Sequence, residues 1–247
     1  MTNIYYIISI PPKPRSSGLF CLCKKHPHCW VINCNFLYET PLAHIARNTT
    51  FCTRVAKFEM KLSEKNPALI LIDVQKAFLD ENYWGGNRNN KNAEIICEKL
   101  LDKWRKLNLP VFHIRHSSTN PNSKLNENNP GFDFNENVLP AENEPIITKN
   151  VNSAFIGTDL KEQLDNSGIN TLVIVGITTN HCVSTTTRMA GNFGYETYLI
   201  SDATATFDRI GINGEKYDSE TIHLTTLANL NEEFATVMNY EKLMNEL

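Results

Sequence analysis

The feature that most constrains the fold is a series of short apolar runs, each followed by a polar residue. Residues 68–72 are followed by Asp73, residues 146–148 by Lys149, and residues 171–175 by a glycine and a polar stretch that leads to Cys182. A short apolar run bounded in this way is typical of a strand buried on both faces of a sheet. Helical patterns separate these runs, and the alternation predicts a parallel sheet with right-handed crossovers.

The whole pattern predicts an α/β fold. We expect a three-layer, Rossmann-like domain with a mainly parallel sheet of about six strands and helices on both faces. Strands are expected at residues 68–73, 110–114, 146–149, 171–175, 196–200 and 234–237, and helices at 93–107, 157–166, 218–230 and from Cys182 onward. Residues 117–144 form a long loop rich in Asn and Pro. A loop of that length in a compact domain usually serves as a lid or a binding loop.

Three of the polar residues suggest chemistry. Parallel strands bring their carboxyl ends to one edge of the sheet, where open α/β folds bind ligands, so Asp73, Lys149 and Cys182 are expected to converge there. Each has an ordinary structural explanation when taken alone, as a cap, a solvent-exposed cation or a small buried hydrophobe. Together they are coherent, because the carboxylate can accept the thiol proton and the ammonium stabilises both anions. The helix start at Cys182 is expected to favour the thiolate.

Four segments carry a resemblance to a known family. They read LIDVQKAF at 71–78, KNVNSAF at 149–155, GITTNHCVSTTT at 176–187 and GYETYLISDATATF at 194–207. In this order and spacing, from about Pro67 to the carboxyl end, the chain resembles the isochorismatase-like cysteine hydrolase superfamily, which includes nicotinamidases and N-carbamoylsarcosine amidases. The resemblance implies that Asp73 is the general base, Lys149 its charge partner and Cys182 the nucleophile.

The resemblance also implies the surroundings of the nucleophile. A cis peptide bond is expected between Ile177 and Thr178, and the backbone N–H groups of Thr178 and Cys182 are expected to form an oxyanion hole. The implied reaction is hydrolysis of a small-molecule amide or related C–N bond through a thioester, with no cofactor. Family members commonly assemble as dimers or tetramers, so a homo-oligomer is expected by resemblance.

Several further residues are candidates for the substrate pocket. Aromatic side chains are either walls of the pocket or part of the core, and His116 lies just beyond a predicted strand. The candidate substrate-binding residues are Gln75, Phe78, Trp84, His116 and Phe155. Asn180 is a candidate helix cap or pocket residue, while Arg188 and His223 are expected to face solvent or another subunit.

No metal site is expected from the histidine pattern. Metal-dependent nicotinamidases use an Asp-x-His pair with further histidines, and neither His113 nor His116 is preceded by an aspartate at that spacing. His113 is expected to be a packed strand residue. His181 precedes the thiol in sequence and is expected to point elsewhere, so a Cys–His dyad is not predicted.

Composition narrows the class of protein. The chain has 247 residues, a net charge of −3 and 41% hydrophobic residues, which suits one α/β domain with a substantial core. There is no basic stripe to bind nucleic acid and no run of about 20 apolar residues to cross a membrane. Five of the seven cysteines precede residue 60, so the predicted domain is sparse in cysteine, as in a reducing compartment, and a cytoplasmic location is expected.

The first part of the chain does not share the pattern of the rest. Residues 1–59 are expected to be an irregular extension that does not fold or follows a misassigned start codon, with a targeting segment as the alternative. The folded hydrolase domain is expected to cover residues 60–247. The spacing of Cys21, Cys23 and Cys29 matches no common zinc finger.

Other functions were weighed against amide hydrolysis. An isochorismatase-type vinyl ether hydrolase does not need a thiol, and a non-catalytic binding or scaffold subunit has no need of all three polar residues. A dinucleotide-binding domain needs a glycine-rich turn after the first strand, where this chain has Asp73 and Gln75 but no glycine. The loop at residues 115–123 resembles that of cysteine hydrolases similar to streptothricin hydrolase.

Overall fold

The computed structural model describes residues 24–26, 29–31 and 61–247. Strands β1 (Lys24–His26) and β2 (Cys29–Val31) pair with each other in antiparallel orientation. This short pair is regular structure where the sequence predicted none. The prediction of an extension over residues 1–59 otherwise falls outside the described residues, as do Cys21 and Cys23.

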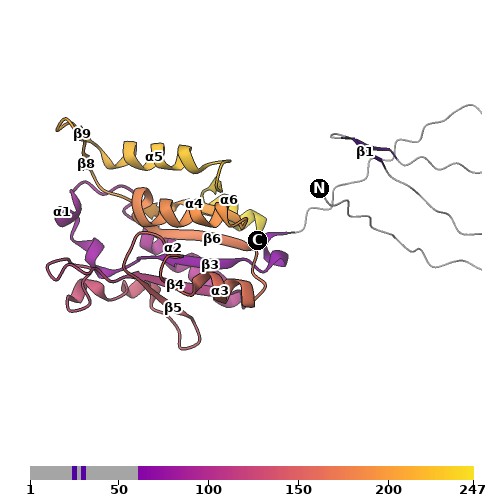
Figure 1. The fold of residues 1–247 in the computed structure, drawn as a ribbon, viewed down its shortest axis with the longest axis horizontal. Helices are drawn as coiled ribbons and strands as arrows, with labels where there is room; N and C mark the ends of the chain where they lie inside the picture. The colour runs from indigo at the N-terminus through magenta and orange to yellow at the C-terminus, as the bar shows by residue number, and fades with distance from the viewer. Residues whose placement is uncertain (1–23, 27–28, 32–60) are drawn as a thin grey trace, which may run out of the picture. The chain divides into compact units, whose positions relative to one another are not determined.

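The folded unit from residue 61 is built on one sheet of six parallel strands. Its order is β10-β7-β6-β3-β4-β5, and Figure 1 shows β6, β3, β4 and β5 one below the other. The strands are β3 (Ala68–Ile72), β4 (Val111–His116), β5 (Ile146–Lys149), β6 (Thr171–Ile177), β7 (Glu196–Ala205) and β10 (Thr236–Met238). The predicted α/β fold and its six strands are confirmed.

Helices cover both faces of the sheet because alternate strand residues point to opposite sides. Ile70 and Ile72 of β3 belong to a core under helices α3, α4 and α5, whereas Leu69 and Leu71 belong to a core under α2 and α6. The helices are α2 (Ala93–Lys106), α3 (Leu160–Asn166), α4 (Ser184–Asn192), α5 (Ser219–Leu230) and α6 (Tyr240–Glu246). In Figure 1, α4 and α5 lie above the sheet.

The observed elements differ from the predicted ones mainly at their ends. Helix α3 begins at Leu160 because turns occupy the residues before it. Strand β7 continues past residue 200 to Ala205, since it keeps its partner β6 after its pairing with β10 has ended. Short elements were not predicted: the final helix α6, helix α1 (Glu81–Trp84), and the hairpin of β8 (Arg209–Ile210) and β9 (Lys216–Tyr217).

The Asn-rich loop at residues 117–144 is ordered by its own side chains. Four asparagines each accept a hydrogen bond from the backbone N–H two residues later, which closes a tight turn without help from a sheet or helix. They are Asn120, Asn126, Asn129 and Asn135. The loop also contains the 3₁₀ turns η3 (Pro130–Phe132) and η4 (Glu136–Val138). The high asparagine content of the loop therefore reflects a series of turns that asparagine side chains close.

Gly176 controls how the end of β6 lies against β3. Its φ is +126°, and a Cβ on it would lie 2.0 Å from the carbonyl oxygen of Ile72. The register between β6 and β7 shifts between Ile174 and Gly176. Only glycine permits this close approach, so the chain that leaves β6 is directed over the end of β3.

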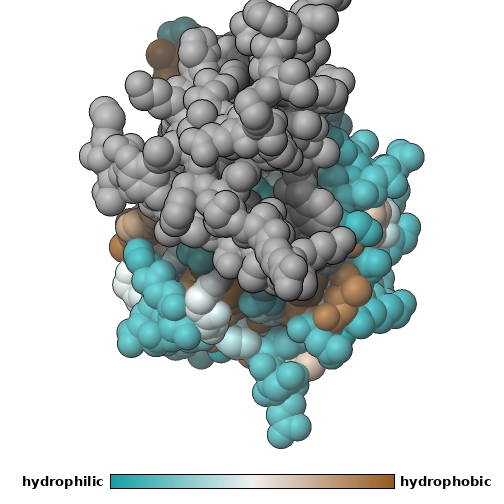
Figure 2. Space-filling model, turned by 90° about the vertical axis from the view of Figure 1, so that its right-hand side faces the viewer, coloured by the Kyte–Doolittle hydropathy of each residue, from teal (hydrophilic) through white to brown (hydrophobic). Residues whose placement is uncertain are grey.

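None of the helices among the described residues has the length and apolar character needed to cross a membrane. Figure 2 shows the face at the right-hand side of Figure 1, where the visible surface of the described residues is mostly hydrophilic with small hydrophobic patches.

His113 is packed inside the domain, as the sequence predicted. It is fully buried in β4, and its Nε2 lies 2.8 Å from the carboxylate of Glu144. Glu144 also accepts hydrogen bonds from the Arg105 guanidinium and the N–H of Ala141. Burial raises the pKa of Glu144, but the bonds from Arg105, Ala141 and His113 outweigh it and lower the pKa from 4.5 to about 2. The network holds the end of the long loop against β4.

The close approach at Gly176 gives a stability prediction. Gly176→Ala is expected to lower the free energy of unfolding by at least about 2 kcal/mol, because the methyl group meets backbone atoms and φ is unfavourable. Urea unfolding measures the loss. Gly168→Ala is the matched control, since Gly168 has φ +64° and open space around it, and it should cost about 1 kcal/mol. Equal losses in the two variants would contradict the argument.

The Glu144 network gives a pH prediction. The pKa of Glu144 is depressed on folding, so its contribution is present above the ordinary value of 4.5 and is lost as the pH falls toward 2. Glu144→Gln should therefore lower stability at pH 7 by about 1–3 kcal/mol, and the difference from wild type should shrink between pH 4.5 and 2. Denaturant unfolding at several pH values measures this; a difference independent of pH in that window would sink it.

Candidate active site

The carboxylate, the ammonium and the thiol predicted from the sequence meet at the carboxyl edge of the sheet. Asp73 follows β3, Lys149 ends β5, and Cys182 lies in the turn after β6. The Lys149 Nζ donates a hydrogen bond to Asp73 Oδ2 at 2.6 Å, and both side chains are completely buried. The Cys182 Sγ and an oxygen of Asp73 lie within 4.8 Å of each other.

Asp73 is held in an unusual backbone conformation at the end of β3. Its φ is +50°, which aspartate tolerates better than most residues. Its N–H donates to the Ile114 carbonyl, and its own carbonyl accepts from the Gln75 N–H. One carboxylate oxygen is bound by Lys149, while the other, Oδ1, is buried without a hydrogen-bond partner. A free acceptor therefore remains on this carboxylate.

Cys182 lies in a π-helical turn, η5 (Thr179–Val183), rather than in the first turn of a regular α-helix. Burial and the charge of Asp73 raise the pKa of its thiol far above the ordinary value, and the opposing effect of Lys149 is smaller. The expectation of a thiolate favoured by a helix end is wrong for this arrangement. The raised pKa favours the thiol over the thiolate in this site.

Lys149 keeps its charge despite burial. Burial lowers its pKa, but the attraction of Asp73 and of Cys182 outweighs this effect and raises the pKa above the ordinary value. The ammonium is thus a permanent positive charge beside the carboxylate and the thiol.

The segment that links β6 to the thiol has the geometry expected for it. The peptide bond between Ile177 and Thr178 is cis. Thr178 is buried, and its carbonyl accepts hydrogen bonds from the N–H groups of His181 and Val183, which folds the chain back on itself. Thr178 and Cys182 are therefore at the two ends of one tight turn.

His116 faces the three groups. Its Nδ1 accepts a hydrogen bond of 3.2 Å from Lys149, and a ring nitrogen lies within 4.8 Å of both Asp73 and Cys182. Burial and then the Lys149 charge lower the pKa of His116, although Asp73 opposes them, so the ring is neutral at pH 7. Its place in the pocket, which the sequence left open, is at the centre of the site.

The other candidate pocket residues have contacts with their neighbours in the fold. The Gln75 side chain is buried and fully used: it accepts from the His116 N–H and donates to the carbonyls of His116 and Phe132. Phe78 is buried in a cluster with Trp84, whose Nε1 donates to the Ala77 carbonyl. Phe155 is buried against Phe193 and Tyr195. Gln75 therefore positions His116, and the two phenylalanines are core residues.

His223 was expected on the surface but is buried. Its Nδ1 lies 2.9 Å from the hydroxyl of Thr179, the first residue of η5, and its Nε2 faces the amide of Asn90. Asn180 accepts a hydrogen bond from the Thr206 hydroxyl and does not cap a helix. These contacts hold the turn from α5 and the end of β7, which no local sequence signal indicates.

Asn152 is a site residue that the sequence reasoning missed. Its Oδ1 lies 3.9 Å from the Cys182 Sγ. The signal was present, since Asn152 stands three residues after Lys149 in one of the recognised segments.

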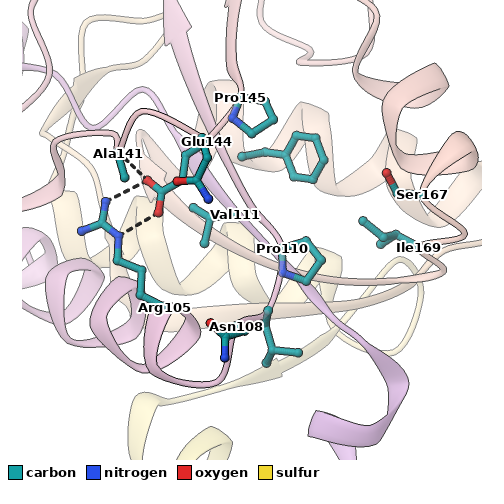
Figure 3. Close-up of a pocket in the computed structure, with 12 residues that line it drawn as sticks. Arg105, Asn108, Pro110, Val111, Ala141, Glu144, Pro145, Ser167 and Ile169 are labelled. Atoms are coloured by element: carbon teal, nitrogen blue, oxygen red, sulfur yellow. Dashed lines mark hydrogen bonds and ion pairs between the residues drawn. The ribbon is translucent and has the colours of Figure 1, made fainter.

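Two hollows flank the sheet edges. One, of about 480 Å³, lies beside the site and is lined by Lys149 and mainly polar residues of the loop and of β5: Ser117, Ser118, Thr119, Asn126, Glu127, Thr148, Asn150 and Gly157. The other, of about 560 Å³, lies at the opposite, amino-terminal edge, where Figure 3 shows the Arg105–Glu144 pair on its wall. The long loop thus borders the site, and the larger hollow is remote from it.

The fold and this edge define an α/β protein of the three-layer type with a candidate active site at the carboxyl ends of its strands. Residues 67–242 match the family model of the isochorismatase domain. The chain therefore belongs to the isochorismatase family and is an isochorismatase-family hydrolase, which confirms the resemblance.

Three relatives illustrate the similarity. An uncharacterised isochorismatase family protein of Bacillus subtilis, YrdC, is 51% identical over 74% of this chain and 97% of its own length. Nicotinamidase 3 of Arabidopsis thaliana is 29% identical over 77% of this chain and 95% of its own. A crystal structure of an isochorismatase-family protein from Chromobacterium violaceum has a TM-score of 0.72 and 39% identity, and covers 76% of this chain and 96% of its own.

The buried ion pair gives a prediction. Lys149→Met should lower the free energy of unfolding at pH 7 by about 3–5 kcal/mol, because it leaves the Asp73 carboxylate buried without its counter-ion. The double variant Asp73→Asn/Lys149→Met should recover part of this loss in urea unfolding. Lys161→Met, in the exposed pair with Asp165, is the control and should change little. A single variant as stable as wild type would contradict the role of the pair.

Proposed function

We propose that the chain is a cysteine-dependent hydrolase of a small-molecule amide or a related C–N bond. One observation carries the proposal: the Cys182 Sγ lies beside the Asp73 carboxylate, one oxygen of which is buried without a hydrogen-bond partner. Burial and the Asp73 charge raise the pKa of that thiol. A thiol with a raised pKa needs a base to deprotonate it, and a carboxylate lies beside this one. The arrangement suits a reaction in which the base takes the proton as the sulfur attacks.

The proposed reaction has two halves. Asp73 accepts the Cys182 proton as the sulfur attacks the substrate carbonyl carbon, and the backbone N–H groups of Thr178 and Cys182 stabilise the oxyanion. The C–N bond breaks as Asp73 returns the proton to the departing nitrogen. A water molecule, deprotonated by Asp73, then cleaves the thioester, and the proton goes back to the sulfur.

Lys149 has an electrostatic part in this proposal. It is within hydrogen-bond distance of Asp73 and keeps its charge, so it stabilises the developing thiolate without giving up a proton. His116, neutral and fixed by Lys149 and by Gln75, offers its remaining ring nitrogen to the substrate.

Two observations bear on the substrate class. The hollow beside the site is lined mainly by hydroxyl and amide groups, which suits a polar substrate. One relative, nicotinamidase 3, is named for nicotinamide, a small aromatic amide. Ureido acids, N-carbamoyl compounds and nicotinamide are therefore all candidate substrates.

The test is ammonia release from a panel of small amides that includes nicotinamide, N-carbamoyl compounds and ureido acids. Cys182→Ala should lose at least about a thousandfold in kcat/KM while its melting temperature stays close to that of wild type. Cys97→Ala is the matched control, because Cys97 is a buried cysteine of α2 in the core cluster that does not contain Cys182, and it should keep its activity.

Turnover that survives Cys182→Ala would overturn the proposed nucleophile. Absence of ammonia from the panel, with pyruvate released from a vinyl ether substrate instead, would favour isochorismatase-type chemistry. Homo-oligomer formation and a cytoplasmic location stay predictions.

A further inference from the structure

The three groups around Lys149 form a set of metal-ligand atoms. An oxygen of Asp73, a ring nitrogen of His116 and the Sγ of Cys182 all lie within 4.8 Å of one another. Carboxylate, imidazole and thiolate are the three ligand types that zinc and related soft cations prefer in proteins.

The surroundings of this set are those of a cation-binding site. Lys149 donates to Asp73 at 2.6 Å and to His116 at 3.2 Å, so two of the three ligands already bind a positive charge. Asp73 Oδ1 is buried with no hydrogen-bond partner at all. That oxygen is a free, desolvated acceptor that a cation would satisfy.

We propose that a thiophilic divalent cation, Zn²⁺ or Cd²⁺, binds reversibly to Asp73, His116 and Cys182 and inhibits the enzyme. The metal replaces the thiol proton, which is released to solvent, and a metal–sulfur bond forms without any change of oxidation state. The inhibition rests on the proposed function, because a metal bound to these groups blocks both the nucleophile and its base. The metal binding does not depend on the proposed function.

The geometry sets what must move. Tetrahedral zinc with bonds of roughly 2.0–2.3 Å brings its ligand atoms to roughly 3.3–3.7 Å from one another. The three atoms must therefore move closer to one another by up to about 1.5 Å. His116 has room for this, since it ends β4 and is half-buried. The Lys149 ammonium must move away from the metal, so binding should be weaker than at a structural zinc site.

The binding test uses Cd²⁺ titration of the full chain, followed by the ultraviolet charge-transfer band of the cadmium–thiolate bond. Five cysteines precede residue 60, so the readout is the difference between variants. The absorbance of the band at saturation should be larger in wild type than in Cys182→Ser by the contribution of one cadmium–thiolate bond. His116→Asn should keep the full increment but need at least tenfold more Cd²⁺. Cys97→Ser and His181→Asn are the matched controls and should titrate like wild type.

The activity arm separates this inference from the proposed function. Zn²⁺ should inhibit hydrolysis of the best panel substrate, a chelator should restore it, and His116→Asn should raise the inhibitory concentration at least tenfold. Identical Cd²⁺ titrations for wild type and Cys182→Ser overturn the metal site even if Cys182 proves essential for turnover. A further outcome is a band that decreases in Cys182→Ser while the wild-type chain hydrolyses no amide of the panel. That result supports the metal site and contradicts only the proposed hydrolase function.

Discussion

The buried ion pair between Asp73 and Lys149 is the interaction on which the rest of the site depends. It joins the end of β3 to the end of β5 across the intervening strand β4, and no part of either side chain reaches solvent. Removing two charges from water costs several kcal/mol per ion, so such a pair persists only when geometry and neighbouring groups offset that cost. Here the pair adds to the effect of burial on its neighbours. Burial and then the Lys149 charge lower the pKa of His116, and burial and then the Asp73 charge raise the pKa of the Cys182 thiol.

The sheet was predictable because its signal is local. Runs such as residues 68–72 and 172–175 are apolar throughout, and that pattern is typical of a buried parallel strand. The rule that parallel strands end at one edge was then enough to bring Asp73, Lys149 and Cys182 together. This rule does not predict how deeply each side chain is buried. The pKa of the Cys182 thiol depends on its burial and on its distance from a carboxylate, and the residues next to it in sequence indicate neither.

The contacts around the site were predictable only in part. Gln75 stands beside Asp73 in sequence and invites a role in substrate binding, yet its amide is consumed by backbone groups of β4 and the loop. His223 is 41 residues after Cys182 and has no local signal, but from α5 it contacts the first residue of η5, the turn that contains Cys182. Pairings between distant segments depend on how helices pack on the sheet. A single sequence shows the periodicity of a helix well, but it does not show which distant residue a polar side chain on that helix will contact.

The Asn-rich loop has a consequence for how this enzyme's selectivity is organised. Four of its turns are each closed by an asparagine side chain that accepts from the backbone N–H two residues later, so much of the path of the loop is set by local contacts. Asn126 closes one of these turns and also lines the hollow beside the site, and Ser118, another lining residue, accepts a hydrogen bond from the Asn120 N–H. Thr119 and Glu127 line the hollow without taking part in the four asparagine turns. An exchange of Thr119 or Glu127 therefore alters the lining alone, whereas an exchange of Asn126 alters the lining and the path of the loop together.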